Sequence, residues 1–194
     1  KTLATVLDLK KSGFNATPHI SCISSSKAEI KELLDKYKSN KINHLVALRG
    51  DNPSGSINFG ELNYANELVN FIKSEMGDTF KIDVGAYPEV HPESETAKQD
   101  FINFKNKVEA GADSAITQFF YNVDAYFKFV DECQKNSINI PVVPGIMPIY
   151  NSKQLIRFAN NCGAEIPRWL KFKLEDYSDD LESLREFGVD FISE

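Results

Sequence analysis

A group of polar residues follows directly after the apolar core of the segment HLVALRG at residues 44–50. Arg49 can bind a phosphate through two parallel hydrogen bonds, and Gly50 allows the backbone to approach a ligand closely. Asp51 supplies a carboxylate whose charge can act on a bound cofactor. The residues NPSG at 52–55 are typical of a turn. The Arg-Gly-Asp triplet therefore fits either a ligand-binding loop or a solvated surface turn.

A second candidate is the segment AYPEVHPE at residues 86–93. Its two prolines, Pro88 and Pro92, favour a rigid loop over a helix. Such a loop can present the ring of Tyr87 and the imidazole of His91 to a ligand. The alternative is that His91 is only solvated.

A helix is expected to begin near Ser94, and it carries Asp100, Asn103 and Lys107 at spacings that place some of these side chains on one face. The N–H groups of a helix N-terminus, together with a lysine, suit a diphosphate. The alternative is an ordinary solvent-exposed helix face.

Gln118 lies in the otherwise apolar segment ITQFFY at residues 116–121. A buried glutamine needs hydrogen-bond partners, and its amide suits a pterin-like ring, although the backbone can also satisfy it. His19 lies inside a predicted strand, where a histidine is usually structural, and Phe158 could face a pocket. No Ser-His-Asp set is recognisable and the three histidines are scattered, so neither a catalytic triad nor a metal site is predicted.

Short apolar runs predict the strands that would position these residues. They cover residues 17–23, 44–50, 81–88, 114–120 and 140–148. The second, fourth and fifth runs are nearly continuous, which is typical of strands buried on both faces in a parallel sheet. Amphipathic helices are predicted between the strands from apolar stripes that include Ile30 and Leu34, Leu62 to Ile72, Phe101 to Val108, and Val123 to Cys133. A capping box at Ser26 and Glu29 is expected to begin the first of these stripes.

The alternation of strands and helices, with strand starts about 26 to 37 residues apart, predicts an α/β fold with one parallel sheet. An open doubly wound sheet and a (β/α)8 TIM barrel both remain possible. No GxGxxG follows a strand, and polar residues follow several strands rather than one switch point, which favours the barrel. Five predicted strands leave the first two and the last βα units of a complete barrel unaccounted for. We expect residues 1–194 to form a single, partial catalytic barrel domain.

The composition excludes several other classes of protein. The chain has 194 residues and a net charge of −6, which argues against a non-specific nucleic-acid binder but not against a local anion site. The three cysteines form no CxxC pair, so reduced thiols in a cytoplasmic protein are expected. No apolar run has the length of a membrane span, and no membrane association is predicted.

The segments HLVALRGD (44–51), AYPEVHPE (86–93), ITQFF (116–120) and PGIMPIYNSKQ (144–154) closely resemble the methylenetetrahydrofolate reductase family. TPHISC (17–22) and the helix at 97–111 are also similar, so the resemblance covers essentially the whole chain. It implies an FAD-containing flavoprotein oxidoreductase of one-carbon metabolism and methionine biosynthesis. The implied reaction reduces 5,10-methylenetetrahydrofolate to 5-methyltetrahydrofolate with NAD(P)H, by ping-pong hydride transfer through FAD. A homo-oligomer is also expected.

The resemblance also implies roles for individual residues. Positions that match FAD contacts are His19, Leu48, Arg49, Gly50, Asp51, Tyr64, Ala65, Tyr87, His91, Ser94, Asp100, Asn103, Asn106 and Lys107. At Asn106, relatives often carry a basic residue instead. Positions that match the folate side are Asp51, Gln118, Gln154 and Phe158. Asp51 and Gln118 are expected to be catalytic: Asp51 stabilises the cationic iminium form of the folate, and Gln118 orients the pterin.

Two motifs of the family are missing from this sequence. One is an FEFFPP-like strand that carries a glutamate as general acid, and the other is an HFYTLN-like last strand. Their absence motivates a second hypothesis, a truncated and catalytically incomplete flavin-binding barrel. A third hypothesis is another flavin-bearing barrel, such as proline dehydrogenase, although the LRGD and YPEVHPE segments argue against it.

Overall fold

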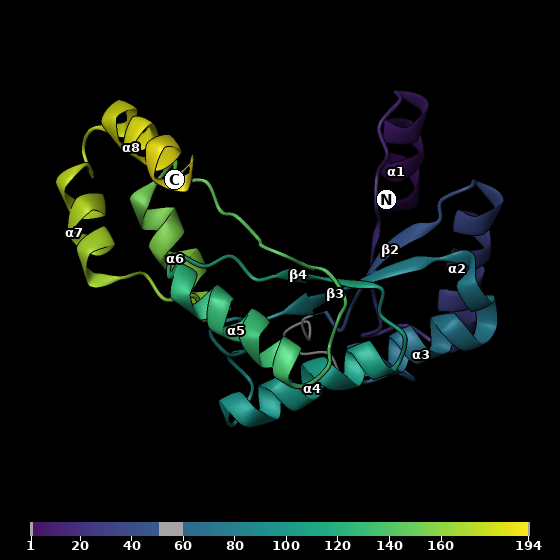
Figure 1. The fold of residues 1–194 in the computed structure, drawn as a ribbon. Helices are drawn as coiled ribbons and strands as arrows, with labels where there is room; N and C mark the ends of the chain where they lie inside the picture. The colour runs from purple at the N-terminus through teal and green to yellow at the C-terminus, as the bar shows by residue number, and fades with distance from the viewer. Residues whose placement is uncertain (1, 51–59, 194) are drawn as a thin grey trace. The chain divides into compact units, whose positions relative to one another are not determined.

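The computed structural model describes residues 2–50 and 60–193 of the chain. Within these residues lies a sheet with the strand order β1-β2-β3-β4-β5. Figure 1 labels β2, β3 and β4 of this sheet. The strands are β1 (His19–Ser21), β2 (His44–Leu48), β3 (Lys81–Ala86), β4 (Ser114–Thr117) and β5 (Val142–Val143). All of them lie inside the segments predicted from the sequence, and all are shorter than those segments. Gln118 therefore lies just after β4 rather than inside it.

Helices connect the strands, as the apolar stripes predict. They are α1 (Thr2–Lys11), α2 (Lys27–Ser39), α3 (Ala65–Met76), α4 (Ala97–Glu109), α5 (Val123–Lys135), α6 (Ser152–Cys162), α7 (Arg168–Asp176) and α8 (Leu181–Ser193), with a short 3-10 helix η1 (Gly77–Thr79) after α3. Two boundaries differ from the prediction. The helix expected near Ser94 begins at Ala97, and Leu62 lies before α3, although its side chain is buried.

Each strand of the sheet is the spatial neighbour of the strand that precedes it in the sequence. The pairs β1–β2 and β2–β3 are parallel, with Val46 opposite both His19 and Asp83. A doubly wound sheet would reverse its strand order at a switch point. The order seen here has no reversal, so this parallel α/β fold is consistent with a (β/α)8 barrel.

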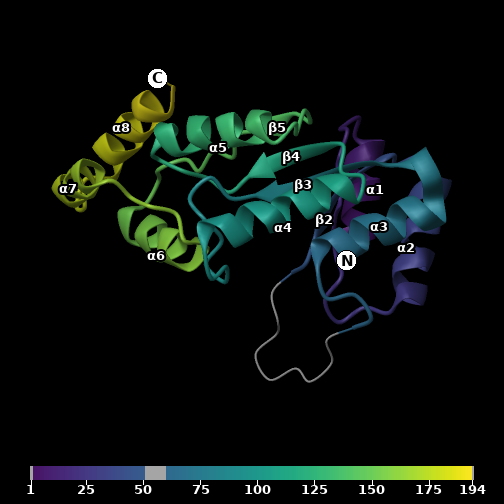
Figure 2. The ribbon, with the colours of Figure 1, turned by 60° about the horizontal axis from the view of Figure 1, so that its bottom comes forward.

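The chain divides into two compact units, and the first comprises the described residues up to Gly85 together with 103–115. In this unit α3 contacts both α2 and β2 (Figure 2). The predicted capping box begins α2: the Ser26 hydroxyl accepts from the N–H of Glu29, and the Glu29 carboxylate accepts from the N–H of Ser26. The buried stripe of α3 includes Leu68, Val69 and Ile72, as predicted.

A polar group lies among these apolar side chains of the first unit. Asp83 on β3 is 6% exposed, and its carboxylate accepts a hydrogen bond from the Ser114 hydroxyl. The Nε2 atom of His44 lies 2.8 Å from the other carboxylate oxygen of Asp83. A buried carboxylate is costly unless it has partners, and Asp83 has partners on both neighbouring strands.

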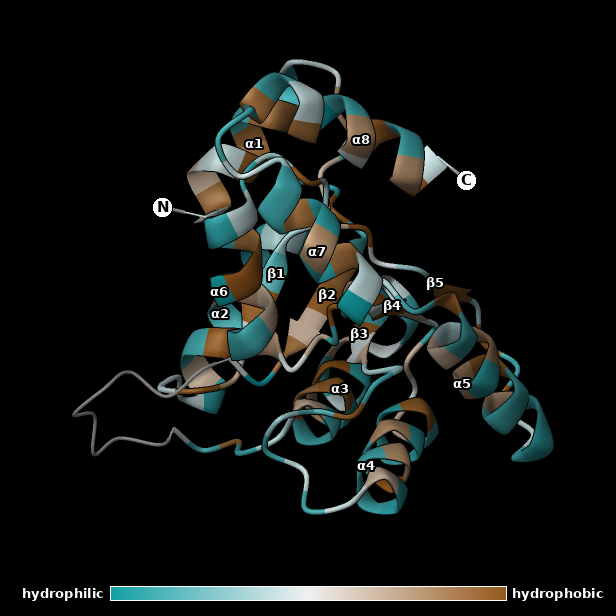
Figure 3. Ribbon diagram, turned by 90° about the vertical axis from the view of Figure 1, so that its left-hand side faces the viewer, coloured by the Kyte–Doolittle hydropathy of each residue, from teal (hydrophilic) through white to brown (hydrophobic). Residues whose placement is uncertain are grey.

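The second unit comprises residues 86–102 and the described residues from Ile116 onward. Its helices show alternating hydrophobic and hydrophilic bands (Figure 3), and their apolar faces pack into one core. The core contains Phe119, Ile149, Leu155, Ala159, Ala164, Ile166, Leu170, Leu174 and Leu184. Leu170, Leu174 and Leu184 are completely buried, so α7 and α8 are integral parts of this unit.

One expectation about burial is wrong. The nearly continuous apolar run at 140–148 predicts a strand buried on both faces, but only Val142 and Val143 form a strand, and Val143 is 49% exposed. Pro141 and Pro144 flank these two residues and cannot donate to a sheet ladder, which explains why β5 is so short. No helix in the described part of the chain is both long enough and apolar enough to cross a membrane.

Candidate functional site

The loop after β3 presents two of the predicted ligand-binding rings together. The rings of Tyr87 and His91 meet edge to face, with centroids 4.4 Å apart. Between them Val90 has a φ of 87°, in the left-handed region that β-branched residues rarely enter. Such a conformation costs roughly 1–3 kcal/mol and persists only where the surroundings enforce it. The loop is therefore held in shape by contacts elsewhere.

One of these contacts comes from Asp100 on α4. Its carboxylate accepts hydrogen bonds from the His91 N–H at 3.0 Å and from the Ser94 hydroxyl at 2.9 Å. Ser94, which was expected at the start of the helix, lies three residues before it and faces Asp100 instead. Asp100 therefore organises the loop that carries His91.

The other predicted residues of the second unit lie at the end of β4 and on α6. Gln118 is partly buried, and its Oε1 atom accepts a hydrogen bond from the N–H of Phe119 at 3.1 Å. Phe158, 46% exposed on α6, stacks on the ring of Phe119 with centroids 5.8 Å apart. Gln154 is exposed in the first turn of α6, where its N–H donates to the Asn151 side chain.

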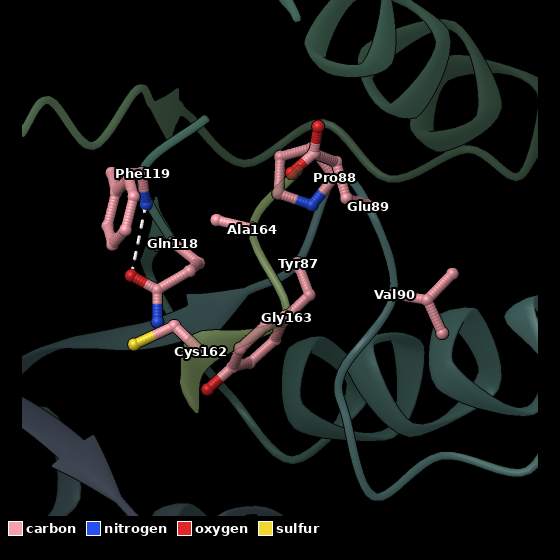
Figure 4. A pocket seen from close by; sticks show the side chains of 9 residues that line it. All are labelled: Tyr87, Pro88, Glu89, Val90, Gln118, Phe119, Cys162, Gly163 and Ala164. Carbon is pink, nitrogen blue, oxygen red and sulfur yellow. Dashed lines mark hydrogen bonds between the residues drawn. The ribbon is translucent and has the colours of Figure 1, made fainter. Parts of the chain in front are cut away.

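A small pocket lies in this unit, between the loop after β3, the end of β4 and the turn after α6 (Figure 4). Its lining includes the predicted residues Tyr87 and Gln118, and it is completed by Pro88, Glu89, Val90, Phe119, Cys162, Gly163 and Ala164. The space amounts to about 170 Å³, part of it open to solvent. Because this volume includes open solvent, the enclosed part of the pocket is smaller still, and the pocket can hold only part of a ligand.

The surroundings of Glu89, a carboxylic acid in the pocket lining, change its acidity. Burial raises the pKa of its carboxyl, and the nearby charge of Glu165 acts in the same direction. The hydrogen bond from the Glu165 N–H to Oε2, at 2.8 Å, lowers this pKa and so opposes the other two effects. Because burial is the largest effect, the pKa of Glu89 lies above the ordinary value of a glutamate.

The remaining predicted residues that the structure describes lie in the first unit. In this unit, hydrogen bonds from the end of β1 and the residues after it hold the end of β2. The Ser21 hydroxyl donates to the carbonyl of Arg49 at 2.6 Å, and the N–H of Ile23 donates to the same carbonyl at 3.0 Å. Gly50 has a φ of 85°, and a Cβ atom there would lie 2.0 Å from the Ser21 hydroxyl oxygen. Only glycine therefore fits at position 50. The Arg49 Nε atom donates to the Gly50 carbonyl at 3.2 Å.

Five further predicted FAD contacts lie on or beside the helices and strands of this unit. His19 begins β1 and is exposed, and Leu48 ends β2. Tyr64, 59% exposed, is the N-cap of α3, and Ala65 is the first residue of that helix. On α4, the Lys107 ammonium group donates to the Gly85 carbonyl at 2.5 Å.

Asn103 and Asn106 are exposed on α4. Asp51, the predicted catalytic carboxylate, lies outside the described residues.

Seven of the nine pocket residues were not predicted from the sequence: Pro88, Glu89, Val90, Phe119, Cys162, Gly163 and Ala164. Glu89 stands in the same segment as Tyr87 and His91, and this closeness in the sequence is the signal that could have identified it. Phe119 stands next to Gln118 in the segment 116–121, and Cys162 belongs to no CxxC pair. In the described ranges, 2–50 and 60–193, no group of three His, Cys, Asp or Glu side chains could hold a metal ion.

Comparison with known proteins gives a consistent result. Residues 2–194 match the family model described as methylenetetrahydrofolate reductase. The chain is 44% identical over 183 residues to 5,10-methylenetetrahydrofolate reductase from Buchnera aphidicola subsp. Schizaphis graminum, covering 94% of this chain and 61% of that protein. It is 42% identical over 179 residues to 5,10-methylenetetrahydrofolate reductase from Escherichia coli K12, covering 92% of this chain and 59% of that protein. The chain thus spans about three fifths of the length of these relatives.

Among solved structures, a similar fold occurs in an uncharacterized protein from Clostridium thermocellum, which binds two copies of 5-methyl-5,6,7,8-tetrahydrofolic acid. The TM-score is 0.56 at 19% identity, and the match covers 89% of this chain and 58% of that one. At this level of identity the likeness concerns the fold alone.

Proposed function

Because the chain belongs to the methylenetetrahydrofolate reductase family, we propose that it is part of a flavoprotein that reduces 5,10-methylenetetrahydrofolate to 5-methyltetrahydrofolate with NAD(P)H. The observation that carries this proposal is the family match over residues 2–194. The same match speaks against the hypothesis of a different flavin-bearing barrel. A homo-oligomer in the cytoplasm remains a prediction.

The described residues have the chemistry that FAD requires. Tyr87 and His91 are aromatic rings in edge-to-face contact, and Arg49 and Lys107 are cations suited to a diphosphate. Both cations donate to backbone carbonyls, so each would share its donors with the cofactor. When bound, FAD would supply hydride transfer between the nicotinamide and the folate.

The chain itself is proposed to bind and orient the substrate. The Gln118 amide would hydrogen-bond the pterin, and its Oε1 atom would have to exchange the Phe119 N–H for the ligand. Phe158, which is half exposed and stacked on Phe119, offers an apolar face to the pterin or the nicotinamide. Gln154 is proposed to contact the folate, and Asp51 to stabilise positive charge on it.

The proposal is tested with the full-length protein that contains this chain. The purified protein should carry bound FAD, which NADH or NADPH bleaches in the absence of oxygen and which methylenetetrahydrofolate then restores. A protein without flavin would contradict the proposal, as would a reduced flavin that the folate leaves reduced. A complete cycle would also contradict the hypothesis of a catalytically incomplete barrel.

The substitution Gln118→Ala tests the role of the pterin-orienting amide. Removing one hydrogen bond of about 1–1.5 kcal/mol should slow reoxidation by the folate roughly tenfold. Reduction by the nicotinamide should change much less. Stopped-flow measurement of the two half-reactions separates these effects. Equal slowing of both would show that Gln118 acts on the cofactor or on the fold instead.

A further inference from the structure

Two segments far apart in the sequence are joined beside the pocket. Glu89 in the loop after β3 accepts a hydrogen bond from the N–H of Glu165, 76 positions later in the chain. Gly163, at the end of α6, has a φ of 70°, and a Cβ atom there would lie 2.8 Å from Pro92 Cγ. Figure 4 shows Gly163 and Ala164 next to the loop that carries Tyr87, Pro88 and Glu89. The loop is thus packed closely against the turn that follows α6.

The loop needs such an anchor because its backbone is strained at Val90. Asp100 binds the loop on the far side of Val90, through the His91 N–H. On the near side, the Glu89 carboxylate fastens the loop to a different segment. Val90 therefore lies between two anchors, one on α4 and one on the turn after α6. Tyr87 and His91 stand on either side of Val90 in this segment.

We propose that Glu89 is a positioning residue, which sets the Tyr87 and His91 rings for the flavin by fastening their loop to the Glu165 backbone. The inference rests on the proposed function, because the flavin is what the rings would bind. Glu89 itself is assigned no contact with the reacting atoms.

The raised pKa of Glu89 follows from its surroundings. Its Oε1 atom is shielded from solvent and has no hydrogen-bond partner among the residues that the structure describes. The titratable groups around it are Tyr87 and His91 on its own loop, and Cys162 and Glu165 on the facing segment. A neutral carboxyl leaves less uncompensated charge in this place than a carboxylate does, in keeping with the raised pKa.

Because its pKa is raised, the contribution of Glu89 to the stability of the loop depends on pH. Since the folded pKa of Glu89 is raised, its contribution to stability is complete below the ordinary pKa of a glutamate. That contribution is lost as the pH rises through the raised pKa. Ionisation strengthens the hydrogen bond from the Glu165 N–H but leaves a charge in a buried place, and burial is the larger effect. Wild-type protein should therefore hold its flavin less tightly at the upper end of this range.

The test compares Glu89→Ala, Glu89→Gln and the control Glu95→Gln in the full-length protein. Glu95 lies in the same connection between β3 and α4 and is exposed. Glu89→Ala should weaken FAD binding about five- to tenfold, because one anchoring hydrogen bond is lost. Glu89→Gln keeps an acceptor for the Glu165 N–H and should bind FAD within about twofold of wild type, without the loss of affinity at raised pH. Glu95→Gln should match wild type throughout.

Hydrogen exchange of the flavin-free protein tests the anchor independently of the cofactor. Glu89→Ala should raise exchange in the peptides that cover 87–92 and 163–167, whereas Glu89→Gln should not. Unchanged exchange and unchanged FAD affinity in Glu89→Ala would overturn the inference, as would a glutamine variant as impaired as the alanine variant. If wild type and Glu95→Gln bound no FAD, the proposed function would fail, and the exchange data would still decide whether Glu89 anchors the loop.

Discussion

At the scale of single residues, the three cysteines differ in ways that the sequence alone does not reveal. Cys22 and Cys133 are buried, at 0% and 2% exposure, and burial raises the pKa of both thiols, that of Cys133 to about 11. Cys162 is partly exposed and lines the pocket with Tyr87 and Gln118. Because the thiolate is the reactive form, the first two cysteines should be inert near neutral pH.

Alkylation with iodoacetamide at neutral pH should therefore modify Cys162 first. A ligand that occupies the pocket, FAD or the folate, should slow this modification. Peptide mapping by mass spectrometry gives the rate at each cysteine, with Cys162→Ser as the control. Labelling of Cys22 or Cys133 as fast as that of Cys162 would contradict the burial described above. An unchanged rate at Cys162 with saturating FAD and folate would show that neither ligand reaches the pocket.

At the scale of secondary-structure elements, regular segments could be predicted and loops could not. The α2 capping box was predicted from Ser26 and Glu29, because both partners lie within one helical turn of each other. The link between Glu89 and Glu165 could not be predicted, since it joins positions whose proximity depends on the fold. For the same reason Tyr87 and Gln118 were both identified as candidates, but their meeting in one pocket was not.

The substitution Ser26→Ala tests how much the α2 cap contributes. It removes an acceptor from the N–H of Glu29 and should lower the free energy of unfolding by about 1 kcal/mol. The matched control is Ser39→Ala at the other end of α2, where the hydroxyl donates to the Asp35 carbonyl. This control should change stability by less than about 0.5 kcal/mol. Equal effects in urea unfolding would show that the cap adds nothing to α2.

At the scale of the whole molecule, the sequence predicted the α/β class and the strand positions, and the sequential strand order agrees with the barrel interpretation. The division into two compact units was not predicted, because nothing in the apolar pattern marks a boundary near Gly85 or Ala115. Each unit has buried side chains of its own: Leu68 and Ile72 belong to the first, and Leu174 and Leu184 to the second.

A cavity created in one unit should therefore destabilise mainly that unit. Leu174→Ala should lower the free energy of unfolding by about 2–5 kcal/mol, because Leu174 is completely buried. Hydrogen exchange should rise in α6, α7 and α8 before it rises in β1, β2 and β3. The control Phe172→Ala, on the same helix at 53% exposure, should have a much smaller effect. A uniform rise across the chain would mean that the two units open together.

The polar group of His44, Asp83 and Ser114 has a consequence for how the strands find their partners. Side chains along a strand alternate between its two faces, so a slip of β3 by one position would turn Asp83 away from both His44 and Ser114. A buried carboxylate left without partners costs roughly 3–5 kcal/mol. An apolar residue at position 83 would tolerate such a mispairing far better. The Asp83 carboxylate in the middle of β3 therefore favours the native strand register during folding. It destabilises shifted alignments in which apolar side chains would still be buried.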